Sequence, residues 1–424
     1  MKMGKKVLML IVSLSMITLF VSNVFGQAKT TLRFIGMKQA ALTTEEMNAI
    51  AKEYEALNPD IKIITTYVSY DALHDKQVTA LAAKSEAFDF INVDCIWFPE
   101  FVEAGWLWDV SDKITPEMRE DILKASLDTI TYKGKFWGMP WLIDTKYFFY
   151  NENILNQAGI SNPPRIWEEF TEQCQKIKNA GLVEYPTIWC WSQRECAVCD
   201  FVILLYGFGG KFIDEEFNPV FNDEHGVEAL TWMVESMKKG ISNPASIVSI
   251  EDDVLHTFSQ GKAAFAINWL YMYDLVNDPE KSKVAGQVKM ALIPASRIQV
   301  AKGIESATVD GSMAYAISAF SDNREAAWKY LQYFCGKDVQ KRYSAHMLPI
   351  WKSLLADPEL LTAQPVTLLR FAKQYPYAHL RPTVPYYTEF SKILQVALQN
   401  ALTGKKSPEQ ALNDAAKEIK QIQY

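Results

Sequence analysis

Aromatic rings and carboxylates occur together at several points of the chain, mostly at or just after apolar segments. Asp94 and Trp97 follow one such segment, Trp141 and Asp144 lie close together in a second, and Trp269 ends a third. A ring offers a flat apolar face, and a carboxylate accepts a stronger hydrogen bond than a neutral group does. These residues are therefore candidates for binding a ligand that has both apolar faces and polar groups.

Each of these candidates also has an ordinary structural interpretation. Asp94 could cap the short helix expected after it. Trp141 could line a ligand site or lie in a core, and Asp144 could form an ion pair with Lys146 in a hinge. Trp269 could be a core residue. The sequence leaves these alternatives open.

Further candidates lie in loops, most of them after predicted strands. They are Lys38, Gln39, Trp191, Gln193, Arg194, Glu195, Gly311, Trp351 and Arg381. Residues 191–195 could instead be a solvated charged loop, and Arg381 could form a purely structural ion pair. Gly311 has no side chain, so the backbone there could approach a ligand closely.

Three of the six cysteines lie close together in the sequence, at Cys190, Cys196 and Cys199. The spacing of Cys196 and Cys199 also occurs in redox and zinc motifs, but no second pair of this kind and no His-x-x-x-His accompanies it. Buried free thiols, one local disulfide and a metal or redox site all remain open. We expect neither a metal nor a cofactor, and the pairing of the three cysteines stays undecided.

The length of 424 residues predicts two domains. Apolar residues make up 49% and charged residues 22%, as in ordinary globular proteins. The net charge of −7, without a cluster of Lys and Arg, argues against nucleic acid as a partner. The 12 tryptophans are numerous enough that some rings are candidates to face a ligand.

Residues 1–26 have the pattern of a signal peptide. Lys2, Lys5 and Lys6 precede the apolar run 7–21, and cleavage is expected before Gln27. A retained membrane anchor is the alternative. The first cysteine of the chain is Cys95, so a lipid anchor at the cleavage site is not expected, and no later segment has the length and hydropathy of a membrane span. We expect an exported protein in the periplasm.

The elements after this peptide alternate between strand and helix. Strands are predicted at 31–35, 61–65 and 88–93, with a helix after Thr43 and another over 70–84. Thr43 and Glu46 form a capping-box pattern. This alternation predicts a parallel sheet, whose ligands bind beyond the carboxyl ends of the strands.

The aromatic segment 132–151 then predicts a crossing to a second α/β unit. Helices are expected at 166–180, 200–206, 227–239, 254–260 and 326–334. A strand with its outgoing loop is expected at 187–191, a turn and a strand at 261–269, and strands at 288–293 and 313–317, followed by two C-terminal helices. No low-complexity linker separates the units, which favours two lobes interlocked by several crossings.

Several short motifs, in order, carry a resemblance to a known family. They are Phe88–Asp94 with Glu103–Gly105, Tyr132–Pro140 with Tyr150–Asn151, Ala158–Ile160, Trp167–Phe170, Phe258–Phe265 with Trp269, Ala326–Leu331, and Arg381–Pro382. The chain resembles the extracellular solute-binding proteins of bacterial ABC sugar transporters, the group that includes maltose-binding protein. The resemblance covers nearly all of the chain after residue 26.

The resemblance implies a two-lobed periplasmic-binding-protein fold of type II. Each lobe would hold a mixed, mostly parallel sheet flanked by helices, with residues 27–143 and 305–349 in the first lobe and 144–304 and 350–424 in the second. It further implies a non-enzymatic, monomeric receptor that binds a sugar or polyol between its lobes and delivers it to an ABC permease. Trp269 occupies a position where the family stacks a ring on sugar, and Asp144 one where it often places a hydroxyl acceptor.

The chain departs from binders of malto-oligosaccharides in the loop after Val93, which reads Asp94-Cys95-Ile96-Trp97. Maltose is therefore not carried over as the ligand. A secreted glycoside hydrolase is the alternative function, with Asp94, Asp144 and Glu195 as its possible carboxylates. Nothing in the sequence marks any of the three as a nucleophile.

Overall fold

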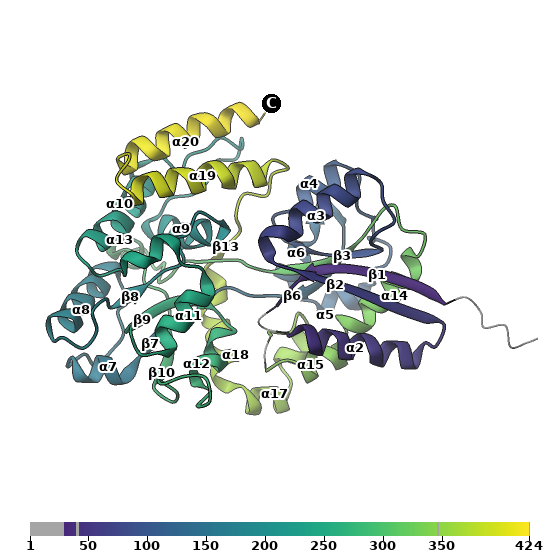
Figure 1. Ribbon diagram of the computed structural model, residues 1–424, viewed down its shortest axis with the longest axis horizontal. Coiled ribbons are helices and arrows are strands. Elements are labelled where there is room, and N and C mark those ends of the chain that lie inside the picture. The colour runs from purple at the N-terminus through teal and green to yellow at the C-terminus, as the bar shows by residue number, and fades with distance from the viewer. Residues whose placement is uncertain (1–28, 40–41, 346, 424) are drawn as a thin grey trace, which may run out of the picture.

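The computed structural model describes residues 29–39, 42–345 and 347–423. Two groups of strands and helices lie side by side, each around its own sheet (Figure 1). The predicted signal peptide, residues 1–26, lies outside the described residues. No helix in the described ranges is long and apolar enough to span a membrane.

The first group is built on a five-stranded sheet with the order β2-β1-β3-β12-β6. Its strands are β1 (Thr30–Met37), β2 (Ile61–Val68), β3 (Phe90–Asp94), β6 (Met139–Leu142) and β12 (Met313–Ile317). β1 pairs parallel with β2 and β3, as the alternating pattern predicts. β12 is antiparallel to both β3 and β6.

The helices of the first group begin at α2, whose start is fixed by local polar contacts. The Thr43 side chain accepts a hydrogen bond from the Glu46 amide, and the Glu46 carboxylate accepts one from the Thr43 amide, so the predicted capping box is confirmed. Helices in this part of the chain are α2 (Thr44–Leu57), α3 (Tyr70–Ala82), α4 (Phe98–Glu103), α5 (Pro116–Asp121), α6 (Lys124–Thr129), α14 (Arg324–Phe334) and α15 (Lys337–Arg342). A two-stranded ribbon joins β4 (Thr131–Tyr132) to β5 (Lys135–Phe136).

The second group is built on a four-stranded sheet with the order β10-β7-β9-β8. Its strands are β7 (Lys146–Asn151), β8 (Thr187–Ile188), β9 (Phe265–Trp269) and β10 (Val288–Ala291). β7 is antiparallel to β10 and β9, and only β8 and β9 pair in parallel. This sheet is mixed, as expected, but it is mostly antiparallel. β7 enters it directly from the first group without a crossover helix, so it need not run parallel to its neighbours.

Most of the remaining helices belong to the second group. The remaining helices are α7 (Glu152–Gln157), α8 (Trp167–Asn179), α9 (Glu195–Phe208), α10 (Glu224–Lys238), α11 (Glu251–Ser259), α12 (Met272–Asn277), α13 (Arg297–Ala301), α16 (Lys352–Leu355), α17 (Pro358–Ala363), α18 (Pro365–Gln374), α19 (Tyr387–Leu402) and α20 (Pro408–Ile422), with 3₁₀ turns η1 (Pro244–Val248) and η2 (Tyr375–Tyr377). Of these, α16 and α17 contact α5 and α15 of the first group through Ser353–Asp121 and Asp357–Lys341. The paired helices α19 and α20 pack over α9 and α10 (Figure 1).

Two of the segments that join the groups run next to each other. One leads from β6 through Asp144 into β7, and the other leads from β11 (Thr308–Val309) through Gly311 into β12. Thr145 and Asp310 form an antiparallel bridge, and the Gly311 amide donates to the Asp144 carbonyl at 3.0 Å. β11 also pairs with β13 (Ala378–His379), so a later part of the chain joins the same place.

A buried carboxylate ties β3 to the loop after β12. Asp89 is 3% exposed and accepts hydrogen bonds from the Arg33 amide at 2.7 Å, the Ser321 hydroxyl at 2.6 Å and the Asn323 side chain at 3.1 Å. We expect Asp89→Ala to lower the free energy of unfolding by roughly 2–4 kcal/mol, because three buried or partly buried donors lose their acceptor. Urea unfolding followed by circular dichroism measures this loss. Glu86→Ala, at an exposed neighbouring position, is the control, and an equal loss in both variants would contradict the assignment.

Candidate functional site

A single buried arginine joins carboxylates from the two groups of elements. Arg381 follows β13 and is 3% exposed. One of its terminal nitrogens lies 2.9 Å from Asp94 Oδ1 at the end of β3, and the other lies 2.9 Å from Glu195 Oε1 at the start of α9. The first sheet and the helical layer of the second group therefore share one guanidinium.

Hydroxyl groups hold both carboxylates in place. Tyr70 donates to Asp94 Oδ2 at 2.9 Å, while Tyr387 and Ser391 donate to the two oxygens of Glu195 at 2.5 Å each. Most of the carboxylate acceptor positions are thus filled, as buried charges require.

The guanidinium remains charged despite its burial. Burial acts to lower the pKa of Arg381, but Asp94 and the other anionic groups around it raise that pKa well above its usual range. The Nε atom of Arg381 is buried and has no hydrogen-bond partner among the described residues, so one donor of the guanidinium is unused there.

A second buried ion pair lies under the ring of Trp269. The Lys146 ammonium, at the start of β7, lies 2.7 Å from Asp200 Oδ1 in α9, and both side chains are fully buried. It also lies 3.0 Å from the Cys190 sulfur and 5.3 Å from the centroid of the Trp269 ring. Lys146 therefore pairs with Asp200 and not with Asp144, the partner considered from the sequence.

The Trp269 ring packs closely against the second crossing segment. A Cβ atom added at Gly311 would lie 2.3 Å from the ring, a distance that side-chain atoms do not tolerate. Gly311 is thus required for close packing against Trp269. The indole nitrogen of Trp269 donates to Glu251 Oε1 at 3.4 Å, and the ring itself is only partly buried.

Asp144 lies beside this contact, in the first crossing segment. The residue is intermediate in exposure, but its carboxyl group is removed from solvent and accepts a hydrogen bond from the Thr145 amide at 2.7 Å. Burial, with a smaller contribution from Asp310, raises the pKa of Asp144 to about 8. The carboxyl group of Asp144 is therefore mostly protonated at neutral pH and is able to donate a hydrogen bond.

Further polar contacts link the two groups closer to the surface. Arg194 pairs with Asp71 of α3 at 2.9 Å, with both side chains half exposed. Thr388 of α19 donates to Glu100 of α4 at 3.2 Å and lies 3.3 Å from the His74 ring nitrogen. Solvent screens contacts of this kind more than it screens the Arg381 pairs.

The structure brings Asp94, Glu195 and Arg381 together, and it places Asp144, Trp269 and Gly311 at the adjoining crossings. Trp97 lies next to the Arg381 group, because its ring stacks on Tyr70 with the centroids 5.3 Å apart. Arg194 lies one residue from Glu195. These positions are those expected if the residues line one site, and their contact with a ligand remains a prediction.

Six other candidates have different surroundings. Trp141 packs against Tyr315 and Phe334 in the first core, and Trp191 stacks on Trp189 in the second. Trp351 is 6% exposed and donates to the Cys335 carbonyl at 2.9 Å. Gln193 and Lys38 are exposed on loops, and the Gln39 amide contacts the Met313 sulfur at 3.4 Å. None of the contacts found for these six residues joins them to the Arg381 group.

The sequence-based predictions miss four residues of the site, namely Tyr70, Tyr387, Ser391 and Asp310. Tyr70 begins the helix after β2, at the same sheet edge as Asp94. This position could have indicated from the sequence that Tyr70 belongs to the site. Asp310 precedes Gly311 and accepts from Tyr375 at 2.7 Å. Nothing in the sequence singles out Tyr387 or Ser391, which lie inside α19.

Residues 40–341 match the family model of bacterial extracellular solute-binding proteins. The chain belongs to this family. The solved structures that it resembles are two-lobed binding proteins of the same kind, and the two-lobed α/β fold expected from the sequence is confirmed.

Two solved structures and one curated relative illustrate the similarity. The maltose-bound MalE3 of T. maritima has a TM-score of 0.85 and 28% identity, over 92% of this chain and 99% of that one. An ABC transporter solute-binding protein of Thermotoga lettingae, bound to α-D-tagatose, has a TM-score of 0.83 and 27% identity, over 93% of this chain and 100% of that one. The mannitol-binding protein of Pseudomonas aeruginosa is 24% identical over 89% of this chain and 91% of its own length.

Removing the shared cation should destabilise this solute-binding protein strongly. Arg381→Met leaves Asp94 and Glu195 largely buried without their cation, and we expect a loss of roughly 3–5 kcal/mol in the free energy of unfolding. Arg342→Met breaks a surface pair with Glu53 and should cost under about 1 kcal/mol. Urea titrations of both variants measure the difference. Similar losses would contradict a larger contribution of the Arg381 pairs to stability.

The raised pKa of Asp144 predicts a pH-dependent stability. Since its folded-state pKa, about 8, lies above the usual value of 3.8, the folded protein binds the proton more tightly. The contribution of Asp144 to the free energy of unfolding is fully present below about pH 4. It falls as the pH rises and is lost once the pH has passed about 8. Each unit of the shift corresponds to about 1.4 kcal/mol.

Asp144→Asn tests this prediction in urea titrations from pH 5 to pH 9. The decline in the free energy of unfolding should be shallower in the variant than in the wild type. Asp60→Asn, at an exposed position, should leave the wild-type decline unchanged. Equal slopes in the wild type and Asp144→Asn would contradict the raised pKa.

Proposed function

We propose that this chain is the binding receptor of an ABC import system that captures a sugar or polyol between its two lobes and delivers it to a membrane permease. Relatives that bind maltose, α-D-tagatose and mannitol support the ligand class, and the tagatose binder is itself an ABC transporter protein. The family membership supports a binding role without catalysis.

The observation that carries this proposal is the convergence at the crossings. Carboxylates from both groups of elements and a charged guanidinium lie next to Asp144, whose pKa is raised to about 8, and to the partly exposed ring of Trp269. Sugar hydroxyls need such donors and acceptors, and the C–H face of a sugar needs a flat ring.

The assignment of the lobe boundaries is part of the proposal. We assign residues 27–143 and 305–349 to the first lobe, and 144–304 and 350–424 to the second. A hinge motion at the crossings would let the lobes close around the ligand. A wrong sugar would leave buried polar groups of the site unpaired, which gives selectivity.

The proposal also includes export of the protein to the periplasm. The signal peptide at residues 1–26 would be removed, and the mature protein would work in the periplasm as a monomer without a lipid anchor. The permease would recognise the closed, ligand-bound form.

Glycoside hydrolysis is the less well supported function for the same carboxylates. Asp94 and Glu195 share one guanidinium, where a glycosidase would hold two carboxyl groups on either side of the scissile bond. Asp144 has the raised pKa of a general acid, but an oxygen of its carboxyl group is bonded to the Thr145 amide. Release of sugar from a panel of glycosides would favour the hydrolase.

A thermal-shift screen against monosaccharides, disaccharides and polyols tests the proposed ligand class. A ligand that binds only the folded protein should add about 2.7 kcal/mol at one hundred times its dissociation constant. We expect a clear rise in melting temperature with at least one sugar or polyol. A shift with amino acids or peptides, and with no carbohydrate, would overturn the proposal.

Two tryptophan variants test the position of the site. Trp269→Ala should weaken binding of the ligand found in the screen about tenfold or more, since ring contacts are worth roughly 0.5–1.5 kcal/mol beyond area burial. Trp108→Ala removes a similarly half-buried ring on the first lobe, beside Arg324, and should leave the affinity unchanged. Calorimetric titrations measure both, and unchanged binding by Trp269→Ala would place the ligand elsewhere.

A further inference from the structure

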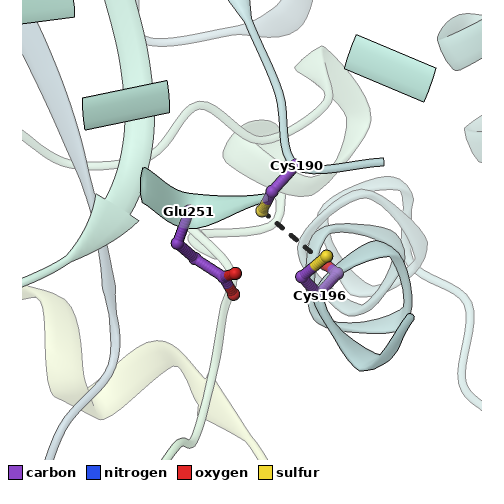
Figure 2. A group of neighbouring side chains, drawn as sticks. All are labelled: Cys190, Cys196 and Glu251. Carbon is purple, nitrogen blue, oxygen red and sulfur yellow. Dashed lines mark hydrogen bonds between the residues drawn. The ribbon is translucent and has the colours of Figure 1, made fainter. Parts of the chain in front are cut away.

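Two of the buried cysteines approach each other at the loop that precedes α9. Cys190 follows β8, and Cys196 is the second residue of α9. Their sulfur atoms and a carboxylate oxygen of Glu251 all lie within 4.8 Å of one another (Figure 2). The Cys190 sulfur also lies 3.9 Å from the Cys196 carbonyl oxygen, so the Cys190 side chain rests against the backbone of Cys196.

The loop between these cysteines and the first turn of α9 carry two of the polar contacts that link the second lobe to the first. Arg194 forms the outer ion pair with Asp71, and Glu195 forms the inner pair with Arg381, which in turn binds Asp94. Any bond between Cys190 and Cys196 would therefore restrain the backbone on both sides of these two residues.

A metal ion fits this cluster poorly, although two thiols and a carboxylate are a possible ligand set. The Lys146 ammonium already lies 3.0 Å from the Cys190 sulfur and 2.7 Å from Asp200. A divalent cation bound to Cys190 would sit beside this fixed positive charge in a buried place, where repulsion is strong. The chemistry open to the two sulfur atoms without an added cation is the formation of a disulfide.

We propose that Cys190 and Cys196 form a disulfide in the exported protein and thereby close the loop that carries Arg194 and Glu195. The proposal rests on the export that belongs to the proposed function, since disulfides form and persist in oxidising compartments. In the structure both cysteines are free thiols, so it represents the reduced form.

The reaction is thiol–disulfide exchange with an oxidant of the disulfide class. We assign the first step to Cys196, which stays 6% exposed even in the packed protein, whereas Cys190 becomes fully buried. Its thiolate attacks the oxidant, the disulfide bond of the oxidant breaks, and one thiol leaves. The Cys190 thiolate then attacks the Cys196 sulfur and displaces the second thiol, so the two protein thiols are oxidised and one oxidant disulfide is reduced to two thiols.

The bond forms during folding, before the loop is fully packed. Burial raises the pKa of the Cys190 thiol well above its usual range, which slows exchange in the packed protein. The remaining cysteines do not take part. Cys95, Cys174 and Cys335 are buried at other places in the fold, and Cys199 lies one helical turn beyond Cys196.

Thiol counting and peptide mapping test the proposal directly. The full chain is refolded from denaturant in a buffer of reduced and oxidised glutathione, then denatured and alkylated. We expect two of the six thiols to be protected, and all six to react after treatment with dithiothreitol. Trypsin cleaves after Arg194, between the two cysteines, so peptides 179–194 and 195–211 should appear as one cross-linked species before reduction.

Serine variants separate the possible partners. Cys199→Ser should keep the cross-linked species, whereas Cys190→Ser and Cys196→Ser should each lose it and leave all remaining thiols reactive. Six reactive thiols in the refolded wild type, a cross-link to Cys199, or one equivalent of bound zinc with free thiols would each overturn the proposal. Thiol counting needs no ligand, so its outcome is independent of the test of sugar binding.

Hydrogen exchange tests the consequence for the loop. Reduction of the wild type should speed amide exchange in residues 191–195 several-fold, because the loop loses its covalent closure. In Cys190→Ser the reductant should change nothing. Equal exchange in the oxidised and reduced wild type would show that the bond does not restrain Arg194 and Glu195.

Discussion

A buried guanidinium needs carboxylates around it, and Arg381 takes its two from different parts of the fold. Asp94 is the last residue of a strand in the first sheet, and Glu195 is the first residue of a helix over the second. The cost of removing these charges from water is offset only while all three remain in contact. Any motion that separates the lobes must therefore break at least one of these pairs, which makes the group the main electrostatic link between them.

The remaining polar residues of the site are arranged around this link. Lys146 and Asp200 form a second buried pair that holds β7 against α9. Gly311 lets the Trp269 ring lie directly on the crossing segment, and Asp144 bonds to the backbone of the same segment through its carbonyl. Rings, charges and crossings thus meet in one place, and a ligand bound there would contact both lobes at once.

The sequence predicts the local elements well, because their signals are local. Apolar spacing and a capping box define α2, and β12 begins and ends at the expected residues. The direction of β7 was harder to predict, since it depends on how the chain enters the second sheet. Residue types after predicted strands pointed to Asp94 and Glu195, and a loop before Pro382 pointed to Arg381, but Arg381 is separated from Asp94 by 287 positions and from Glu195 by 186. Nothing local indicates that the three meet.

The tryptophans show the limit of such patterns most clearly. All four residues of β6 are buried, so alternation along the strand does not distinguish a ring that faces a ligand from one in a core, and Trp141 packs in the core. Trp191 follows a strand of only two residues and stacks on Trp189. Trp269 differs from both because it is only partly buried and because the crossing segment at Gly311 lies against its ring.

Small-angle X-ray scattering tests the central claim that Arg381 links the lobes. Asp94→Asn removes the first-lobe carboxylate and leaves Glu195 to neutralise the arginine, so the protein should remain folded. The account predicts a larger radius of gyration for Asp94→Asn than for the wild type, as the lobes separate. Identical radii of gyration for the two folded proteins would contradict it.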